Sequence, residues 1–159
     1  MAKLQKITPF LWYDTQAEDA ARFYTSIFPD SKIGAISRYG DAGPGPKGSV
    51  MVVSFTLAGQ EFAALNGGPN FKFTEAVSLM VNCETQAEVD HYWEKLLAVG
   101  KAQACGWLKD RYGLSWQITP TMLIRHIGDP DPVKANRVMR AMMEMVKFDI
   151  AALQKAYDG

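Results

Sequence analysis

The stretch Thr15-Gln16-Ala17-Glu18, TQAE in one-letter code, recurs 70 positions later as Thr85-Gln86-Ala87-Glu88. The residue types on both sides of the two copies also correspond at this spacing. The matched pairs are Ile7 with Val77, Thr8 with Ser78, Leu11 with Val81, Asp14 with Glu84, Phe23 with Trp93 and Ile27 with Leu97. Self-similarity at a fixed period is the sequence signature of a repeated structural unit. We therefore interpret the chain as two copies of one module.

A simpler explanation of TQAE is a capping box. In this motif the threonine side chain accepts from the third helical amide and the glutamate reaches back to the cap. We expect both Thr15 and Thr85 to begin helices in this way. A capping box places no demand on the residues before it, however, and these correspond too. The repeat therefore explains more of the sequence than the cap does.

Each copy predicts a strand, a helix and three further strands. In the first copy the periodicity predicts strand 6–13, helix 16–28 and strands 32–39, 49–57 and 61–65. The glycine- and proline-rich run 40–48 predicts a loop. In the second copy the elements are strand 76–82, helix 85–99, a short strand 101–104, and a hairpin of 106–109 and 114–120 around the Asp110–Gly113 turn.

A tail follows the second copy. Asp131 and Pro132 are typical of a helix start, with the aspartate as cap and the proline at the first helical position. We expect one helix that runs to about residue 156. Its methionines are Met139, Met142, Met143 and Met145. Methionine fills irregular cores and also lines adaptable binding surfaces, of which core filling is the commoner use.

Composition limits the classes of function. The chain is 48% apolar and 21% charged, and its 17 basic and 17 acidic residues give no net charge. It therefore lacks the excess of positive charge that nucleic-acid binding requires. No apolar run is long enough for a membrane span, and the first ten residues contain no secretory h-region. The two cysteines fit a reducing compartment, so we expect a cytoplasmic protein without nucleic-acid or membrane partners.

Several short motifs carry a family resemblance. They are Asn66-Gly67-Gly68-Pro69, Val81-Asn82-Cys83, Cys105-Gly106-Trp107-Leu108-Lys109-Asp110, Gly113-Leu114-Ser115-Trp116-Gln117 and, in the tail, Lys147-x-Asp149-Ile150. With the two modules, they resemble the vicinal oxygen chelate superfamily of glyoxalase I, extradiol dioxygenases and bleomycin-resistance proteins. Within it the chain is similar to the PhnB-like branch, often labelled 3-demethylubiquinone-9 3-methyltransferase.

The resemblance implies an α+β fold. Two βαβββ modules would form a cup-shaped mixed sheet with helices outside, plus a C-terminal helix. We expect a single domain over residues 1–159, with module one at 5–68, module two at 74–120 and a helical tail at 121–159. The modules of this superfamily usually pair between chains, so the resemblance also implies a homodimer.

Members of the superfamily often hold a divalent metal through inward-facing histidine, glutamate or glutamine. The resemblance places these positions on Ile7, Ala76, Gln117 and one of Ala63, Ala64 and Leu65. Of these only Gln117 offers a lone pair, and a divalent ion needs about three protein ligands. We therefore expect no metal and no other cofactor. An alignment shifted by one residue would offer Thr8 or Glu75, which leaves a metal-dependent isomerase, lyase or dioxygenase as the alternative.

The branch label implies binding of S-adenosylmethionine. That cofactor usually sits at a glycine-rich turn between a strand and a helix, by the logic of dinucleotide sites. The run Gly43-Pro44-Gly45-Pro46 leads into a strand, and Gly67-Gly68 precedes no helix start. A methyltransferase is therefore the less favoured alternative.

Side chains alternate across strands, which predicts the lining of the cup. The expected ligand-binding residues are Tyr13, Asn66, Ser78, Asn82, Trp107, Lys109 and Gln117. Such a mostly apolar lining with a few polar groups is typical of small-molecule pockets. We expect a metal-independent protein that binds a partly apolar small molecule, with Trp107 as a flat surface and Lys109 to neutralise an acidic group.

Three of these residues also have a structural explanation. Trp107 fits a core position, Asn66 a turn and Lys109 a solvated strand end. Cys105 is a conceivable nucleophile, but no histidine is evidently placed to activate it. No catalytic residue is therefore assigned, and a structural dimer with a vestigial cup is the third possibility.

Overall fold

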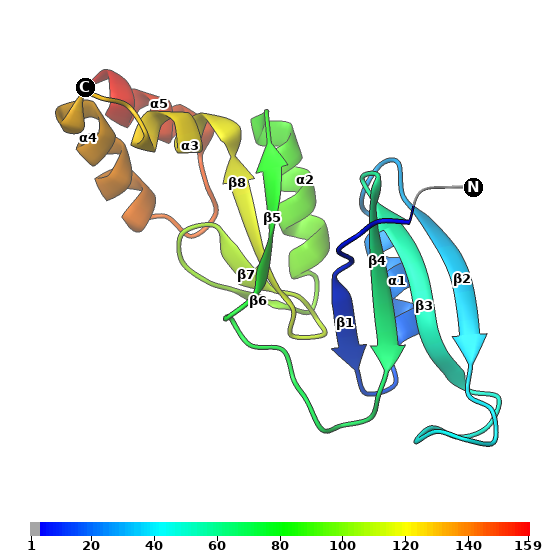
Figure 1. The fold of residues 1–159 in the computed structure, drawn as a ribbon. Coiled ribbons are helices and arrows are strands. Elements are labelled where there is room, and N and C mark those ends of the chain that lie inside the picture. Colours follow the sequence, from blue (N-terminus) through cyan, green and yellow to red (C-terminus); the bar gives the residue numbers. More distant parts are fainter. Residues whose placement is uncertain (1–3) are drawn as a thin grey trace. The chain divides into compact units, whose positions relative to one another are not determined.

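The computed structural model describes residues 4–159 and divides the chain into two compact units, one ending at Phe73 and the other spanning Thr74–Gly159 (Figure 1). Residues 1–3, the start of the segment considered for a secretory signal, lie outside the described residues. Across residues 4–159, no helix is long and apolar enough to cross a membrane.

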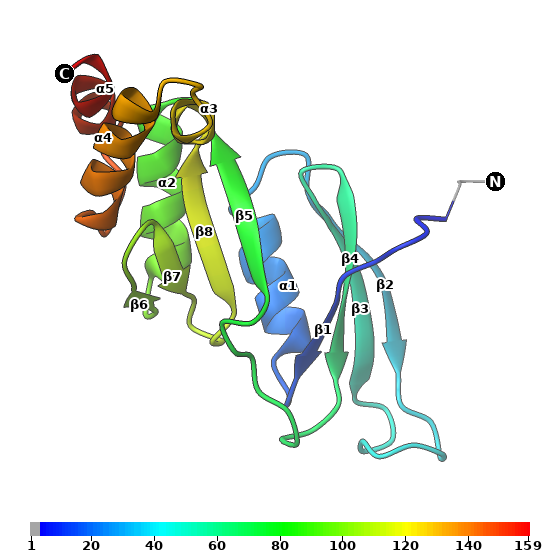
Figure 2. The ribbon, with the colours of Figure 1, turned by 60° about the vertical axis from the view of Figure 1, so that its left-hand side comes forward.

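The first unit is a four-stranded mixed sheet with one helix. Its elements are β1 Phe10–Tyr13, α1 Ala17–Thr25, β2 Lys32–Arg38, β3 Val50–Leu57 and β4 Gln60–Asn66. The strand order is β1-β4-β3-β2, with β1 parallel to β4 and the other pairs antiparallel. Helix α1 packs against one face of this sheet (Figure 2). Leu11, Val53, Phe55 and Ala64 are buried in this unit.

The second unit repeats this topology. Its elements are β5 Ser78–Cys83, α2 Gln86–Leu97, β6 Lys101–Ala102, β7 Trp107–Lys109 and β8 Ser115–Pro120, in the order β5-β8-β7-β6 with β5 parallel to β8. The two βαβββ modules and the α+β class are thus confirmed. The cup concerns the placement of one unit relative to the other and stays a prediction.

The two TQAE copies begin helices differently. Thr85 caps α2, because its side chain accepts from the Glu88 amide at 3.2 Å. The cap predicted at Thr15 is wrong: α1 begins after Gln16 without a side-chain cap of its own. The Ala17 amide instead donates to Asn66 Oδ1 at 2.8 Å, so strand β4 supplies the acceptor. Glu18, the other member of the expected box, is paired with Arg22.

This difference predicts unequal effects of the same substitution. Thr85→Ala removes a helix cap and is expected to lower the free energy of unfolding by about 1 kcal/mol. Thr15→Ala removes none and is expected to cost less than about 0.5 kcal/mol. Urea unfolding of both variants measures the difference. Equal losses would contradict the assignment of the caps.

The tail forms three helices rather than the single helix expected. They are α3 Thr121–Ile127, α4 Pro132–Met143 and α5 Ile150–Asp158. Asp131 caps α4 as predicted, accepting from the Val133 amide at 2.9 Å. The prediction of one helix is wrong because Asp149 caps a new one, its carboxylate accepting from the Ala152 amide.

The tail encloses its own small core. Leu123, Val138, Phe148 and Leu153 are buried together, and Met142 and Met145 pack against them. These two methionines are therefore core residues, whereas Met143 is 66% exposed.

Three groups of contacts attach the tail to the second module. Gln86 of the second TQAE donates to the Phe148 carbonyl at 3.0 Å and accepts from the Ile150 amide at 2.8 Å. Asp90 forms an ion pair with Lys147. The amides of Cys105 and Gly106 donate to the carbonyls of Met145 and Val146 at 2.9 and 2.8 Å. The motif around Cys105 and Gly106 is thus explained by attachment of the tail.

Candidate functional site

The face of the second sheet opposite α2 gathers most of the predicted site. Leu108, Trp116 and Ile118 are buried hydrophobic residues on the α2 side. The residues of opposite parity point the other way and define what we call the far face: Ser78, Met80, Asn82, Lys101, Trp107, Lys109, Ser115, Gln117 and Thr119. Ser78, Asn82, Trp107, Lys109 and Gln117 thus share one face, as alternation predicted. Their role in binding a ligand stays a prediction.

Strand register arranges the far face in rows. One row runs Ser78, Ser115, Lys109 and Lys101, and the next runs Met80, Gln117 and Trp107. The Gln117 amide donates to Ser78 Oγ at 2.8 Å and so joins the two rows. Met80 is 48% exposed and Trp107 is half-buried, so the second row offers an accessible apolar surface on both sides of a fixed amide.

Lys109 already has an acidic partner within the chain. Its ammonium forms an ion pair with Glu75, which precedes β5, and Glu75 also accepts from Gln103 Nε2 at 3.4 Å. The Lys109 ammonium holds the pKa of the Glu75 carboxyl below its ordinary value, since it favours the ionised form. The charge that the sequence assigned to an acidic ligand is therefore met by Glu75 in this structure.

Tyr13 faces α1 and not the opposite side of its sheet. It is 3% exposed, and its hydroxyl lies 3.1 Å from that of Tyr24 on α1. The expected orientation was counted from Ile7, which lies before β1 and is 82% exposed. Strict alternation does not hold across the irregular residues between Ile7 and Phe10, so the predicted side is wrong.

Asn66 also lies on the α1 side and connects three segments. Its Oδ1 accepts from the Ala17 amide, its Nδ2 donates to the Val50 carbonyl at 3.2 Å, and its own carbonyl accepts from the Tyr39 hydroxyl at 2.6 Å. These contacts are the main reason for an asparagine at this position. They are more extensive than the simple turn role that the sequence offered as the alternative.

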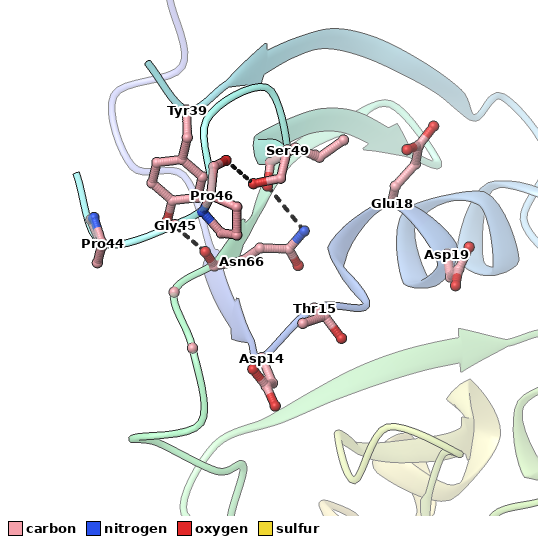
Figure 3. A pocket seen from close by; sticks show the side chains of 13 residues that line it. Asp14, Thr15, Glu18, Asp19, Tyr39, Pro44, Gly45, Pro46, Ser49 and Asn66 are labelled. Carbon is pink, nitrogen blue, oxygen red and sulfur yellow. Dashed lines mark hydrogen bonds between the residues drawn. The ribbon is translucent and has the colours of Figure 1, made fainter. Parts of the chain in front are cut away.

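Asn66 borders a cavity of about 400 Å³ that the sequence did not predict (Figure 3). The loop residues Pro44, Gly45 and Pro46 close one side of it. The lining also includes Asp14, Thr15, Glu18, Asp19, Tyr39, Ser49, Val50, Gly67 and Gly68. The one feature of the sequence that indicated this cavity was the glycine- and proline-rich run. The run needs a glycine at Gly45, because the Tyr39 ring leaves no room for a side chain there.

The residues present do not fit the divalent metal of the superfamily. Register pairs Phe10 with Ala63 and Met80 with Gln117, so Ala63 is the counterpart of Gln117 in the repeat. An alanine offers no ligand atom at that position. Within the part of the chain that the structure describes, no three His, Cys, Asp or Glu side chains lie together as a metal site would require.

The two cysteines are expected to differ in reactivity, because their environments differ. Burial raises the pKa of the Cys83 thiol to about 12, so almost no thiolate forms near neutral pH. Cys105 is partly exposed, and its Sγ contacts the Met142 carbonyl at 3.8 Å. We expect iodoacetamide to modify Cys105 in the native protein and both cysteines in denaturant, as read by mass spectrometry. Equal native labelling would contradict the burial of Cys83.

Duplicated βαβββ modules define the class of this protein as that of the vicinal oxygen chelate fold. The sequence profile of the family 3-demethylubiquinone-9 3-methyltransferase matches residues 5–119. The chain belongs to that family, which confirms the resemblance to the PhnB-like branch. The profile ends before Thr121, so the three tail helices and the tail motif around Lys147 lie beyond the matched residues.

Solved structures agree with this assignment. A PhnB protein from Bacillus cereus is 45% identical, with 74% of this chain covering 100% of that one at a TM-score of 0.68. Protein PA1353 from Pseudomonas aeruginosa is 20% identical over 74% of this chain and 98% of its own, and its TM-score of 0.61 shows the shared fold alone.

A glyoxylase/bleomycin resistance protein/dioxygenase domain from Frankia sp. EAN1pec is 19% identical over 72% of this chain and 95% of its own. Its TM-score of 0.43 is too low to establish a shared fold. No curated protein matches this chain.

Proposed function

We propose that this protein binds a small, partly apolar molecule on the far face of its second sheet, without a metal. The observation that carries the proposal is the row of Met80, Gln117 and Trp107, held in register on the face that α2 does not cover. An indole face accommodates rings and cations, and a fixed amide orients a polar group. The lack of a fitting donor set among residues 4–159 supports binding without metal.

A naphthalene probe tests this proposal. We expect 2-naphthamide to shift the indole NMR signal of Trp107 and to raise the melting temperature, because a ligand bound only by the native state stabilises it. Trp107→Leu keeps an apolar side chain without the flat ring and is expected to weaken binding about tenfold. Met143→Ala, at an exposed apolar residue of the tail, is the control and leaves binding unchanged.

Two results would count against the proposal. One is a Trp107 signal that does not move with any naphthalene probe. The other is near-stoichiometric zinc, nickel, iron or manganese in protein purified without chelator, which would favour a metal-dependent isomerase, lyase or dioxygenase. S-adenosylmethionine belongs in the same titration, because the family is named for a methyltransferase.

We also propose that the protein is a cytoplasmic homodimer. Strands β1 and β5 lie at the edges of their four-stranded sheets, where backbone groups are available to another chain. The two free thiols support a reducing compartment. Light scattering is expected to report twice the chain mass of 17.6 kDa. A single chain mass at micromolar concentration would overturn the dimer.

A further inference from the structure

A buried hydroxyl on the far face has no partner. Among the described residues, Ser115 Oγ is the buried side-chain nitrogen or oxygen atom that lacks a hydrogen bond, and Ser115 is 0% exposed. Buried polar atoms in folded proteins nearly always have a partner, so an orphan of this kind requires an explanation. A donor kept free inside a binding face is one such explanation.

The position of Ser115 is set by its strand. β8 lies between β5 and β7, and register places Ser115 between Ser78 on one side and Lys109 on the other. Lys101 on β6 is the next residue in the same row, directly opposite Lys109. Two hydroxyls and two ammonium groups therefore follow one another across the sheet, an arrangement suited to an anion.

Glu75 reaches across this row. It precedes β5, yet its carboxylate contacts Lys109 on β7 and Gln103 just after β6, and β8 with Ser115 lies between β5 and β7 in the sheet. Glu75 therefore has two partners in the second unit, Lys109 and Gln103. The Glu75 side chain is 51% exposed, and exposed ion pairs are weak, so an incoming anion can replace it at little cost.

We propose that Glu75 stands in for the acidic group of the ligand, so that the far face takes a molecule with a carboxylate, or a similar small oxyanion, joined to a flat apolar part. The anion replaces Glu75 beside Lys109 and accepts from Ser115 Oγ, while the apolar part covers Met80 and Trp107 in the next row. This inference rests on the proposed function and adds the chemical class of the ligand. It also makes Glu75 a competitor that lowers the apparent affinity.

Matched probes separate the anion from the ring. Naphthalene-2-carboxylate and 2-naphthamide share the ring and differ in charge, and each is titrated while the amide signals of β8 and the Trp107 indole are followed by NMR. We expect the wild-type protein to bind the carboxylate more tightly. Lys109→Gln is expected to abolish that preference. Ser115→Ala is expected to weaken binding of the carboxylate probe alone by about tenfold, because hydrogen bonds to charged groups are strong.

Glu75→Gln gives the most specific result. Removing the competing charge is expected to raise the affinity for naphthalene-2-carboxylate about two- to fivefold and to leave the affinity for 2-naphthamide unchanged. Asp90→Asn is the matched control, since it removes a carboxylate from the Lys147 ion pair on α2, away from the far face. It is expected to change neither affinity.

The outcomes distinguish the two proposals. Equal binding of both probes to the wild type, or no gain in Glu75→Gln beyond that in Asp90→Asn, overturns the anionic ligand and leaves binding at Trp107 standing. Failure of both probes to move the Trp107 signal overturns the proposed function and this inference with it.

Discussion

Gly106→Ala is expected to lower the free energy of unfolding by about 2–5 kcal/mol. The backbone at Gly106 has a φ of +77°, a region that costs other residues about 1–2 kcal/mol. A Cβ there would also collide with the Phe148 ring and lie 2.9 Å from the Ile118 carbonyl, and overpacking of this kind costs about 1–3 kcal/mol. Urea unfolding followed by circular dichroism measures the loss.

Gly113→Ala is the matched control. Its φ is +88°, and a Cβ there would meet no atom within 4 Å, so only the backbone cost of about 1–2 kcal/mol applies. The difference between the two variants measures the combined cost of the contacts with the Phe148 ring and the Ile118 carbonyl. If both lose equally, close packing of the tail is not what requires a glycine at 106.

Asp110→Ala is expected to lower the free energy of unfolding by about 3–5 kcal/mol. The carboxylate is 3% exposed and accepts from the amides of Tyr112 and Leu114 and from Trp116 Nε1, at 2.8, 3.1 and 2.9 Å. Each buried donor left without an acceptor costs about 1–3 kcal/mol, and the three losses overlap because they share one group. Thermal and urea unfolding measure the effect.

Asp131→Ala provides the comparison for Asp110. Asp131 is exposed and accepts from one amide, that of Val133, at the start of α4. Its loss is expected to cost about 1 kcal/mol, the usual value of a helix cap. Similar losses in the two variants would mean that the buried aspartate is not the centre of the β7–β8 turn.

Local patterns predicted the repeat well, since helix and strand periodicity depend on neighbouring residues. The 70-residue shift that aligns the TQAE copies also aligns β1 with part of β5. Alternation placed Trp107, Lys109 and Gln117 on one face, because β7 and β8 are regular there. The Asp110–Gly113 turn followed from the same local chemistry, and the Gly113 amide donates to the Asp110 carbonyl at 2.9 Å.

Predictions failed where a partner distant in sequence replaced a local one. Thr15 has the same motif as Thr85, yet Asn66 from another strand supplies the acceptor for α1. Tyr13 has the expected spacing from Ile7, but Ile7 lies outside β1, so its side chain sets no parity for the strand. The tail has helical periodicity, but Asp149 caps a new helix, and Gln86 from α2 binds the Phe148 carbonyl and the Ile150 amide at this break.

Residue spacing and side-chain parity alone establish the duplicated βαβββ order, the family and the composition of the far face. Three further features depend on contacts between distant segments: the strand end that supplies an acceptor to α1, the attachment of the tail, and the pairing of Glu75 with Lys109. The physical reason is that side-chain hydrogen bonds and ion pairs form between groups that meet in space. Residues such as Glu75 and Lys109 become neighbours only after the strands between them have been paired.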